Sequence, residues 1–349
     1  MKKNLVVIGY GGQGAWHGDH ALKSDVVTLH GVYDIRQERM DLARSRGIMT
    51  YDSFESILAD ADVDIVVCAT PNDAHKDIVI RSLFAGKNVV CEKPVALSVS
   101  DFDDMCAAAK ASGKLFTVHQ NRRWDVDFLA IQSIIESGEI GEVLNIESRV
   151  HGSRGVPSDW RCQRAYGGGM ILDWGVHLID QMLQLIPNEK IVRIYNESTN
   201  ITTEEVDDGF HLMLTFASGK RATVEVGTYN FIYMPRFYMQ CKRGTAMIED
   251  WQRCCKIAKM KAWNEKEVIP VQTAAGITKT MAPRDEITLD SYEIARPTSD
   301  VHDFYRNVVR AIEGIEPQRI QLEEVRRVLL VMEGCFQSAR THQALDVCI

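Results

Sequence analysis

A lysine, an aspartate and a histidine stand where they could perform acid–base chemistry. Asp173 and His177 are four residues apart in a glycine-rich segment that begins at Gly167, so on a helix they would share a face. Histidine is the usual general base near neutral pH, and the aspartate could orient its ring or contact the same substrate. Lys93, in the triplet Glu-Lys-Pro, could hold a hydroxyl or carbonyl oxygen by a charge-assisted hydrogen bond. Taken singly, His177 could equally be a core histidine and Lys93 an ordinary exposed lysine.

A glycine-rich turn follows the first apolar run. Gly9, Gly11, Gly12 and Gly14 form the pattern G-x-G-x-x-G at the start of an expected helix. The pattern alone is weak, but in this context its backbone N–H groups can approach a pyrophosphate at a helix N-terminus. The sequence therefore predicts a dinucleotide-binding turn, with a purely structural turn as the alternative.

An acidic residue stands where the adenosine ribose of such a dinucleotide would lie. Asp34 ends the second apolar run, twenty residues after Gly14. Its carboxylate would accept hydrogen bonds from the ribose hydroxyls and repel a 2′-phosphate, which favours NAD. Arg36 could instead hold that phosphate, so NADP stays open, and Asp34 could also serve as a helix N-cap.

Two further polar segments each follow an apolar run. Thr70, Asn72 and His75 come after one run, and Glu92 and Lys93 come after the next. The carboxyl ends of parallel strands meet at one edge of a sheet, where ligands bind in open α/β folds. His177 and Asp180 have a spacing that would suit a metal, but no third ligand clusters nearby in sequence, so we expect no metal ion.

The elements needed to position these residues are those of a doubly wound parallel sheet over residues 1–121. Short runs without polar alternation are separated by helical periods, which is typical of strands buried on both faces. Ser53 is expected to cap a helix through Ala59, and Ser100 to cap a helix from Asp101 to Ala111. The expected strands are Leu5–Ile8, Val26–Tyr33, Asp64–Ala69, Asn88–Cys91 and Leu115–His119.

The sequence of residues 122–349 predicts a second, α+β domain, whose strands are longer and alternate between apolar and polar residues. Ser218-Gly219 is expected to form a hairpin turn between the strands Gly209–Phe216 and Arg221–Gly227. Arg243-Gly244 is expected to form a turn between a second pair of strands. Such alternation indicates an antiparallel sheet with one wetter face. The remaining expected elements are the strand Val143–His151 and the helices Asp127–Ser137, Val301–Ile312 and Leu322–His342, while Val268–Ser299 is left unassigned.

Composition excludes several classes of protein. The chain has 349 residues, a formal net charge of −8 and no basic run, which disfavours nucleic acid or an anionic membrane as a partner. The first apolar stretch breaks at Gly9, too early for a signal peptide. The nine cysteines are irregularly spaced, as expected for reduced thiols in a cytoplasmic protein.

Together these segments resemble the glucose–fructose oxidoreductase and inositol 2-dehydrogenase family (Gfo/Idh/MocA), over essentially the whole chain. The resemblance implies a Rossmann domain followed by an open-faced, mostly antiparallel sheet whose face mediates homodimers or homotetramers. It also implies a cis Lys93–Pro94 peptide and a catalytic set of Lys93, Asp173 and His177. The segments that carry it are Gly9–Gly14, Thr70–His75, Glu92–Pro94, Asn121–Arg123, Trp160–Arg161 and Gly167–His177.

The same resemblance implies roles for other residues and a class of reaction. Gly11, Gly12, Asp34, Asn72, His75, Glu92 and Arg122 would line the cofactor, and Trp160 and Arg161 would contact substrate. The expected reaction moves a hydride between nicotinamide C4 and a hydroxyl carbon of a sugar, cyclitol or glycoside. One alternative is a glycosidase that uses NAD in a redox cycle, which the absence of a secretion signal disfavours. Another is a non-enzymatic sensor, which the presence of Lys93 and His177 disfavours.

Overall fold

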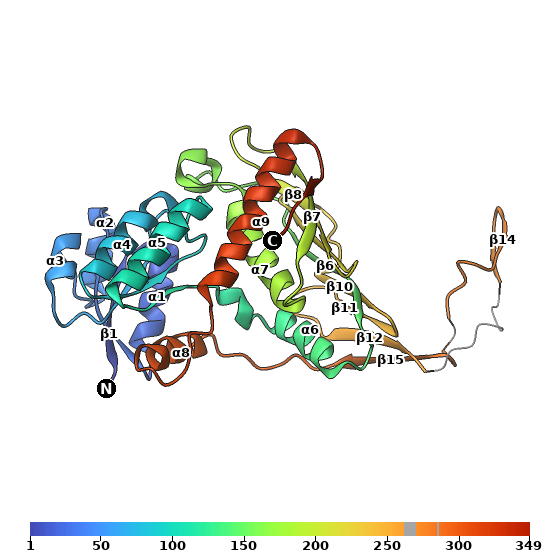
Figure 1. The fold of residues 1–349 in the computed structure, drawn as a ribbon, viewed down its shortest axis with the longest axis horizontal. Helices are drawn as coiled ribbons and strands as arrows, with labels where there is room; N and C mark the ends of the chain where they lie inside the picture. The colour runs from blue at the N-terminus through green and yellow to red at the C-terminus, as the bar shows by residue number, and fades with distance from the viewer. Residues whose placement is uncertain (262–269, 285) are drawn as a thin grey trace.

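The computed structural model describes residues 1–261, 270–284 and 286–349, and begins with a five-stranded parallel sheet (Figure 1). The strand order is β2-β1-β3-β4-β5. Leu5 and Val7 of β1 enter one hydrophobic core and Val6 and Ile8 enter another, so both faces of the sheet are covered, as the unbroken apolar runs predict. The strands are β1 (Lys3–Ile8), β2 (Val27–Tyr33), β3 (Ile65–Cys68), β4 (Asn88–Cys91) and β5 (Phe116–Val118).

Helices connect these strands and leave one point where the direction of winding changes. The chain leaves β1 toward β2 on one side, whereas β3 lies on the other side of β1. Ligands of doubly wound sheets bind outside the carboxyl ends of the strands at such a point. The connecting helices are α1 (Gly12–Leu22), α2 (Gln37–Ser45), α3 (Phe54–Ala59), α4 (His75–Phe84) and α5 (Val99–Ser112).

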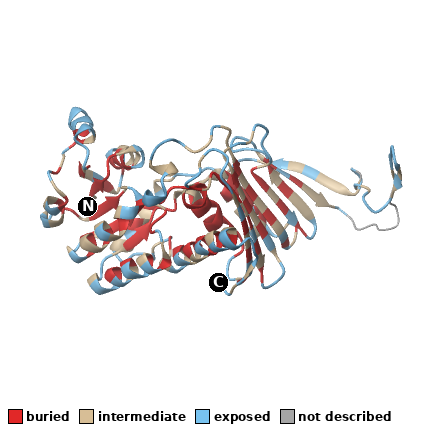
Figure 2. Ribbon diagram, turned by 90° about the horizontal axis from the view of Figure 1, so that it is seen from above, coloured by how far each residue is buried: buried red, intermediate tan, exposed pale blue. Residues whose placement is uncertain are grey.

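The second half of the chain builds a nine-stranded sheet, ordered β15-β12-β11-β10-β6-β9-β8-β7-β16. Its neighbours are antiparallel except β6 and β9, which run parallel. Buried residues gather on the side that α7 (Val176–Leu185) and α9 (Leu322–Thr341) cover (Figures 1 and 2). The strands are β6 (Val143–His151), β7 (Ile191–Thr199), β8 (Gly209–Phe216), β9 (Arg221–Gly227), β10 (Phe237–Cys241), β11 (Gly244–Ile248), β12 (Cys255–Met260), β15 (Leu289–Ile294) and β16 (Leu345–Asp346).

Helices near the C-terminus join the two sheets. α9 contacts β5 of the first sheet and the helix α5 that packs on it, as well as β7 of the second sheet. α8 (Asp303–Ile312) returns to the N-terminal sheet, where Tyr305 reaches His17 of α1. α6 (Val126–Ser137) follows the last parallel strand and ends at Gly138, which has a positive φ. The edge of the parallel sheet therefore faces the helical side of the larger sheet.

The structure confirms the fold class and corrects several local expectations. Ser98, not Ser100, caps α5, because the Ser98 side chain accepts the Asp101 N–H. The second hairpin turns at Lys242-Arg243, since Gly244 already pairs with Cys241. Part of the unassigned stretch forms β15 at the edge of the sheet and a small hairpin of β13 (Val271–Thr273) and β14 (Gly276–Thr278), while residues 268, 269 and 285 of that stretch lie outside the described residues. Among the described residues, no helix combines the length and apolar character needed to cross a membrane.

Candidate active site at the edge of the parallel sheet

The glycine turn has the geometry that a dinucleotide needs. Gly9 adopts a φ of +88°, and a Cβ there would lie 2.6 Å from the Ala69 carbonyl oxygen. Only glycine permits this close approach of the loops after β1 and β3. Nothing lies within 4 Å of a Cβ built on Gly12, so the first N–H groups of α1 border open space. An anionic pyrophosphate fits this open helix N-terminus.

Asp34 and Arg36 lie together at the end of β2. Asp34 accepts hydrogen bonds from the backbone N–H of Tyr10 at 2.8 Å and of Arg36 at 2.9 Å. The N-cap of α2 is Arg36, so the alternative of Asp34 as the capping residue is wrong. The Arg36 side chain extends beside Asp34 and toward Gly11, with its Nε 3.7 Å from the Asp34 carboxylate. A carboxylate and a guanidinium therefore border the position expected for the adenosine ribose.

Lys93 and Asp173 form an ion pair between the two sheets. The Lys93 Nζ donates to the Asp173 backbone oxygen at 2.9 Å and to its Oδ1 at 3.1 Å. Arg161 approaches the other carboxylate oxygen at 3.4 Å. Burial by itself would raise the pKa of Asp173, but Lys93 and Arg161 together outweigh it, so the pKa lies below its ordinary value. Asp173 is therefore an anion that orients the lysine.

His177 is buried beside this pair with an unused nitrogen. Its Nδ1 has no hydrogen-bond partner among the described residues. Burial, followed by the nearby charges of Lys93 and Arg122, holds the pKa of the imidazole well below its usual value. A neutral ring with a free nitrogen can accept a proton, which is the property a general base requires.

Asp173 does not orient the His177 ring, contrary to the expectation from their spacing. The chain forms a π-helical turn over Ile171–Gly175 before α7 begins, and Asp173 engages Lys93 and Arg161 instead. Because the wide turn replaces regular α-helical geometry, the four-residue spacing does not pair the two side chains. Gly175 packs closely against Phe210, since a Cβ there would lie 3.1 Å from the Phe210 ring.

The other strand-end residues mainly join loops to one another. His75 is fully buried, with its ring nitrogens 3.1 Å from the Pro94 oxygen and 3.0 Å from the Thr70 oxygen. Asn72 donates to the Gly167 oxygen at 3.1 Å, which links the first domain to the segment carrying Asp173. Lys93–Pro94 is cis. These contacts indicate that His75 and Asn72 position the loops around the site.

A buried polar cluster surrounds Glu92, and no local sequence pattern predicts it. Glu92 Oε1 accepts from His17 Nε2 and His119 Nδ1, each at 2.7 Å, and Oε2 accepts the Lys93 N–H at 3.2 Å. Tyr305 hydrogen-bonds to the other nitrogen of His17. Burial would raise the pKa of Glu92, but His119 and His17 hold it well below its ordinary value. The only sequence signal is a histidine three residues after Gly14, which the glycine pattern does not include.

Aromatic residues form one wall next to the site. The Arg122 guanidinium lies 4.1 Å from the centre of the Trp174 ring, and Trp174 stacks on Trp251 at 5.8 Å. These three residues and Trp16 line a cleft of about 610 Å³. Trp160, which was expected near substrate, stacks with Arg161 at 4.5 Å. Arg161 thus contacts Asp173 directly, whereas Trp160 packs on the Arg161 side chain.

Asp207 holds the glycine-rich segment in place by a hydrogen bond to its backbone. Gly169 has a φ of +105°, and Asp207 accepts the Ile171 N–H at 2.7 Å. Burial raises the pKa of Asp207 to about 6. This carboxyl therefore fixes the start of the π-helical turn that carries Asp173, and no local sequence pattern indicates it.

Comparison with known proteins agrees with this geometry. Residues 3–120 match the family described as an oxidoreductase family with an NAD-binding Rossmann fold, and residues 128–247 match the GFO/IDH/MocA C-terminal domain. The crystal structure of an NAD-binding protein from Listeria innocua is similar over 99% of both chains, with a TM-score of 0.95 and 43% identity.

Curated relatives are more distant. A scyllo-inositol 2-dehydrogenase (NADP(+)) of Bacillus subtilis is 25% identical over 97% of this chain and 94% of its own length. An uncharacterized oxidoreductase of Schizosaccharomyces pombe is 34% identical, and the match covers 56% of each protein, so the chain spans about half the length of such relatives. On the two matched domains and the near-complete structural similarity, the chain belongs to the Gfo/Idh/MocA family of oxidoreductases and carries its NAD-binding Rossmann domain.

Proposed function

We propose that the protein is an NAD(P)-dependent dehydrogenase that oxidises a hydroxyl carbon of a sugar, cyclitol or glycoside, or reduces the corresponding ketone. The observation that supports this most strongly is the Lys93–Asp173 ion pair beside the neutral, unpartnered His177. The three groups combine a cation for the reacting oxygen with a base for its proton. They lie at the sheet edge that the glycine turn also borders.

Each residue has one role in the proposed chemistry. A bound nicotinamide would supply the hydride acceptor or donor at C4. His177 takes the hydroxyl proton during oxidation and returns it during reduction. Lys93 donates a hydrogen bond to the same oxygen, which strengthens as the oxygen gains negative charge. Asp173 holds the lysine in place, and Arg161 fixes the second oxygen of Asp173.

The proposed cofactor preference is NAD over NADP. Gly11 and Gly12 would hold the pyrophosphate, and Asp34 would face the ribose hydroxyls. Arg36 counters this charge, and the relative from Bacillus subtilis is named for NADP. We favour NAD because the Asp34 carboxylate is fixed by two backbone N–H groups, whereas the Arg36 side chain is half exposed.

A substrate screen tests the proposal. Polyols, inositols and glycosides are incubated with NAD or NADP, and reduced nicotinamide is followed by its absorbance. We expect turnover in at least one class, and a loss of about 10²–10⁴-fold in kcat for His177→Ala and Lys93→Ala with NADH affinity kept. Glycoside cleavage without net NADH would instead favour the redox-cycling glycosidase. Wild-type kcat in either variant would overturn the assigned roles.

We further propose that the protein self-associates as a dimer or tetramer. The face of the sheet that the helices leave open is charged rather than apolar, because it carries the ion pairs of Arg149 with Glu147 and Glu225. Support comes instead from the β13–β14 hairpin, which extends away from the rest of the chain with Ile277 exposed (Figure 1). An extended arm of this kind can bury itself only against another chain. A monomeric mass by light scattering at micromolar concentration would contradict the proposal.

A further inference from the structure

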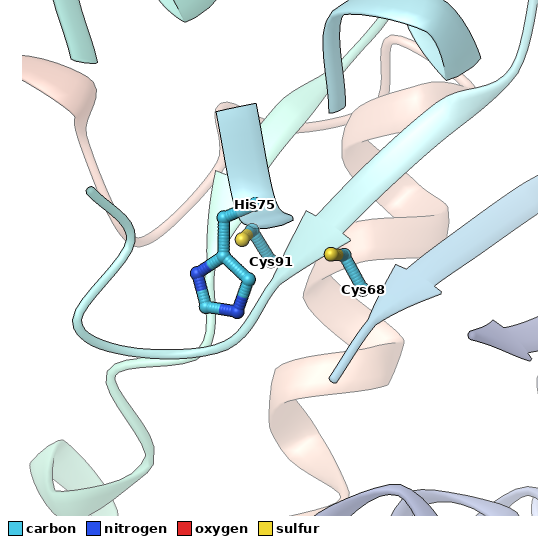
Figure 3. Close-up of side chains that lie close together, drawn as sticks. All are labelled: Cys68, His75 and Cys91. Carbon is cyan, nitrogen blue, oxygen red and sulfur yellow. The ribbon is translucent and has the colours of Figure 1, made fainter. Parts of the chain in front are cut away.

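Two cysteines and a histidine converge beneath the edge of the parallel sheet. Cys68 ends β3 and Cys91 ends β4, where they are direct partners across the parallel pair. His75 begins α4, and Figure 3 shows its ring lying beside both sulfur atoms. All three residues are fully buried, and one ligand atom from each lies within 4.8 Å of the others. The proposed dehydrogenase chemistry uses none of these three side chains.

Both ring nitrogens of His75 face carbonyl oxygens, and a neutral imidazole cannot donate a hydrogen bond to both. Nδ1 lies 3.1 Å from the Pro94 oxygen and Nε2 lies 3.0 Å from the Thr70 oxygen. A neutral imidazole carries one N–H, so it can donate to only one of these carbonyl groups. The other nitrogen and oxygen would then face each other as two acceptors. A positive charge is needed there, either as a second ring proton or as a metal ion.

The other histidine cluster in the described residues has no such requirement. Glu92 accepts one N–H each from His17 and His119, and the second nitrogen of His17 pairs with the Tyr305 hydroxyl. Every contact in that cluster joins a donor to an acceptor when both rings are neutral. His119 Nε2 has no partner among the described residues, but no two acceptors face each other in that cluster, so of these two clusters the one around His75 is the one that requires a positive charge.

We propose that Cys68, His75 and Cys91, together with the Thr70 carbonyl oxygen, bind one structural Zn²⁺. The Nδ1–H donates to Pro94 and so leaves Nε2 as the ligand, which is the usual outer support of a metal-binding histidine. Nε2 and the Thr70 oxygen lie 3.0 Å apart, whereas two tetrahedral ligands with bonds of about 2.1 Å lie about 3.4 Å apart, so the two atoms would separate slightly on binding the ion. Two thiolates would neutralise the ion, and the sulfurs, which lie within 4.8 Å of the other ligand atoms, would close on it to bonds of about 2.3 Å.

Such an ion would join three segments that border the cofactor. Thr70 leads into the loop of Asn72, and Cys91 precedes Glu92 and Lys93. The donors are enclosed, with four protein ligands and no open position, which is the form of a structural rather than a catalytic zinc site. Because the site is buried, the ion would be acquired as the protein folds. The inference does not depend on the proposed dehydrogenase activity.

Metal content and cobalt spectroscopy test the site. The untagged protein is produced in medium supplemented with Zn²⁺, desalted, and analysed for zinc by elemental mass spectrometry. We expect close to one zinc per chain in the wild type and nearly none in Cys91→Ser. Cys335→Ser, which alters a buried cysteine of α9 outside the cluster, should keep the zinc of the wild type.

Protein produced with Co²⁺ in place of zinc provides a readout that needs no variant. Thiolate ligation should give sulfur-to-cobalt charge-transfer absorption in the near ultraviolet, with visible bands typical of a tetrahedral ion. Zinc near zero in the wild type would overturn the proposal and leave a protonated His75 paired with a Cys68 thiolate as the explanation. Zinc unchanged in Cys91→Ser, or a cobalt spectrum without charge-transfer bands, would also overturn it.

Discussion

Removing the Glu92 carboxylate should destabilise the protein far more than removing an exposed carboxylate. In Glu92→Ala, the imidazole N–H groups of His17 and His119 each lose an acceptor at 2.7 Å. A buried donor without a partner costs about 1–3 kcal/mol, so the two rings together cost about 2–6 kcal/mol. Glu92→Gln keeps an oxygen that both imidazole rings can donate to, but it turns an amide nitrogen toward the Lys93 N–H. The glutamine variant should therefore lose less stability than the alanine variant.

Thermal and urea unfolding measure this difference. The entropy of unfolding is about 2.1 cal/mol/K per residue, so 1 kcal/mol corresponds to about 1.4 °C for a chain of 349 residues, and Glu92→Ala should lower Tm by about 3–8 °C. Glu55→Ala serves as a control, because Glu55 pairs with Arg81 at the surface and its loss should leave Tm unchanged. Equal Tm values for Glu92→Ala and the control would refute the view that the cluster depends on this acceptor.

The stabilising effect of Glu92 should also depend on pH. The folded pKa of Glu92 lies well below its ordinary value, so the folded state binds the proton less readily than the unfolded state. The stabilisation is therefore present above the ordinary glutamate pKa and is lost as the pH falls toward the folded pKa. The difference in unfolding free energy between wild type and Glu92→Gln should shrink over that range, and a pH-independent difference would contradict the assigned charge.

Four further predictions concern single residues. Because the folded pKa of Asp207 is raised to about 6, wild-type stability should fall as pH rises from about 4 to 6, and Asp207→Asn should remove this slope in urea titrations. Ser98→Ala should cost about 1 kcal/mol of helix capping, whereas the same change at position 100 should cost nothing measurable. His177 should titrate well below pH 6.5 by NMR, and Lys93→Met should raise that pKa by removing a nearby cation. Asp34→Ala should shift kcat/KM toward NADP, and an unchanged ratio would remove Asp34 from cofactor selection.

The sequence alone determined the features that depend on neighbouring residues. Unbroken apolar runs such as Ile65–Cys68 identified the buried parallel strands, because both faces of such strands are covered. Ser218-Gly219 located a hairpin, and the pattern from Gly9 to Gly14 located the dinucleotide turn, because turns demand particular residues at particular places. The position of the proposed active site at a sheet edge followed from these local signals.

Only the tertiary structure decided which side chains meet. His17, Glu92 and Tyr305 come from α1, the end of β4 and α8, and no local pattern joins residues so far apart in the chain. One of the two roles that the sequence left open for Asp173, orienting the His177 ring, is wrong for the same reason. Its spacing suggested His177, whereas a π-helical turn and the approach of Lys93 from the other domain decided its contacts. Local propensity specifies elements, but the packing of two sheets through α9 determines the distances between charges on which catalysis depends.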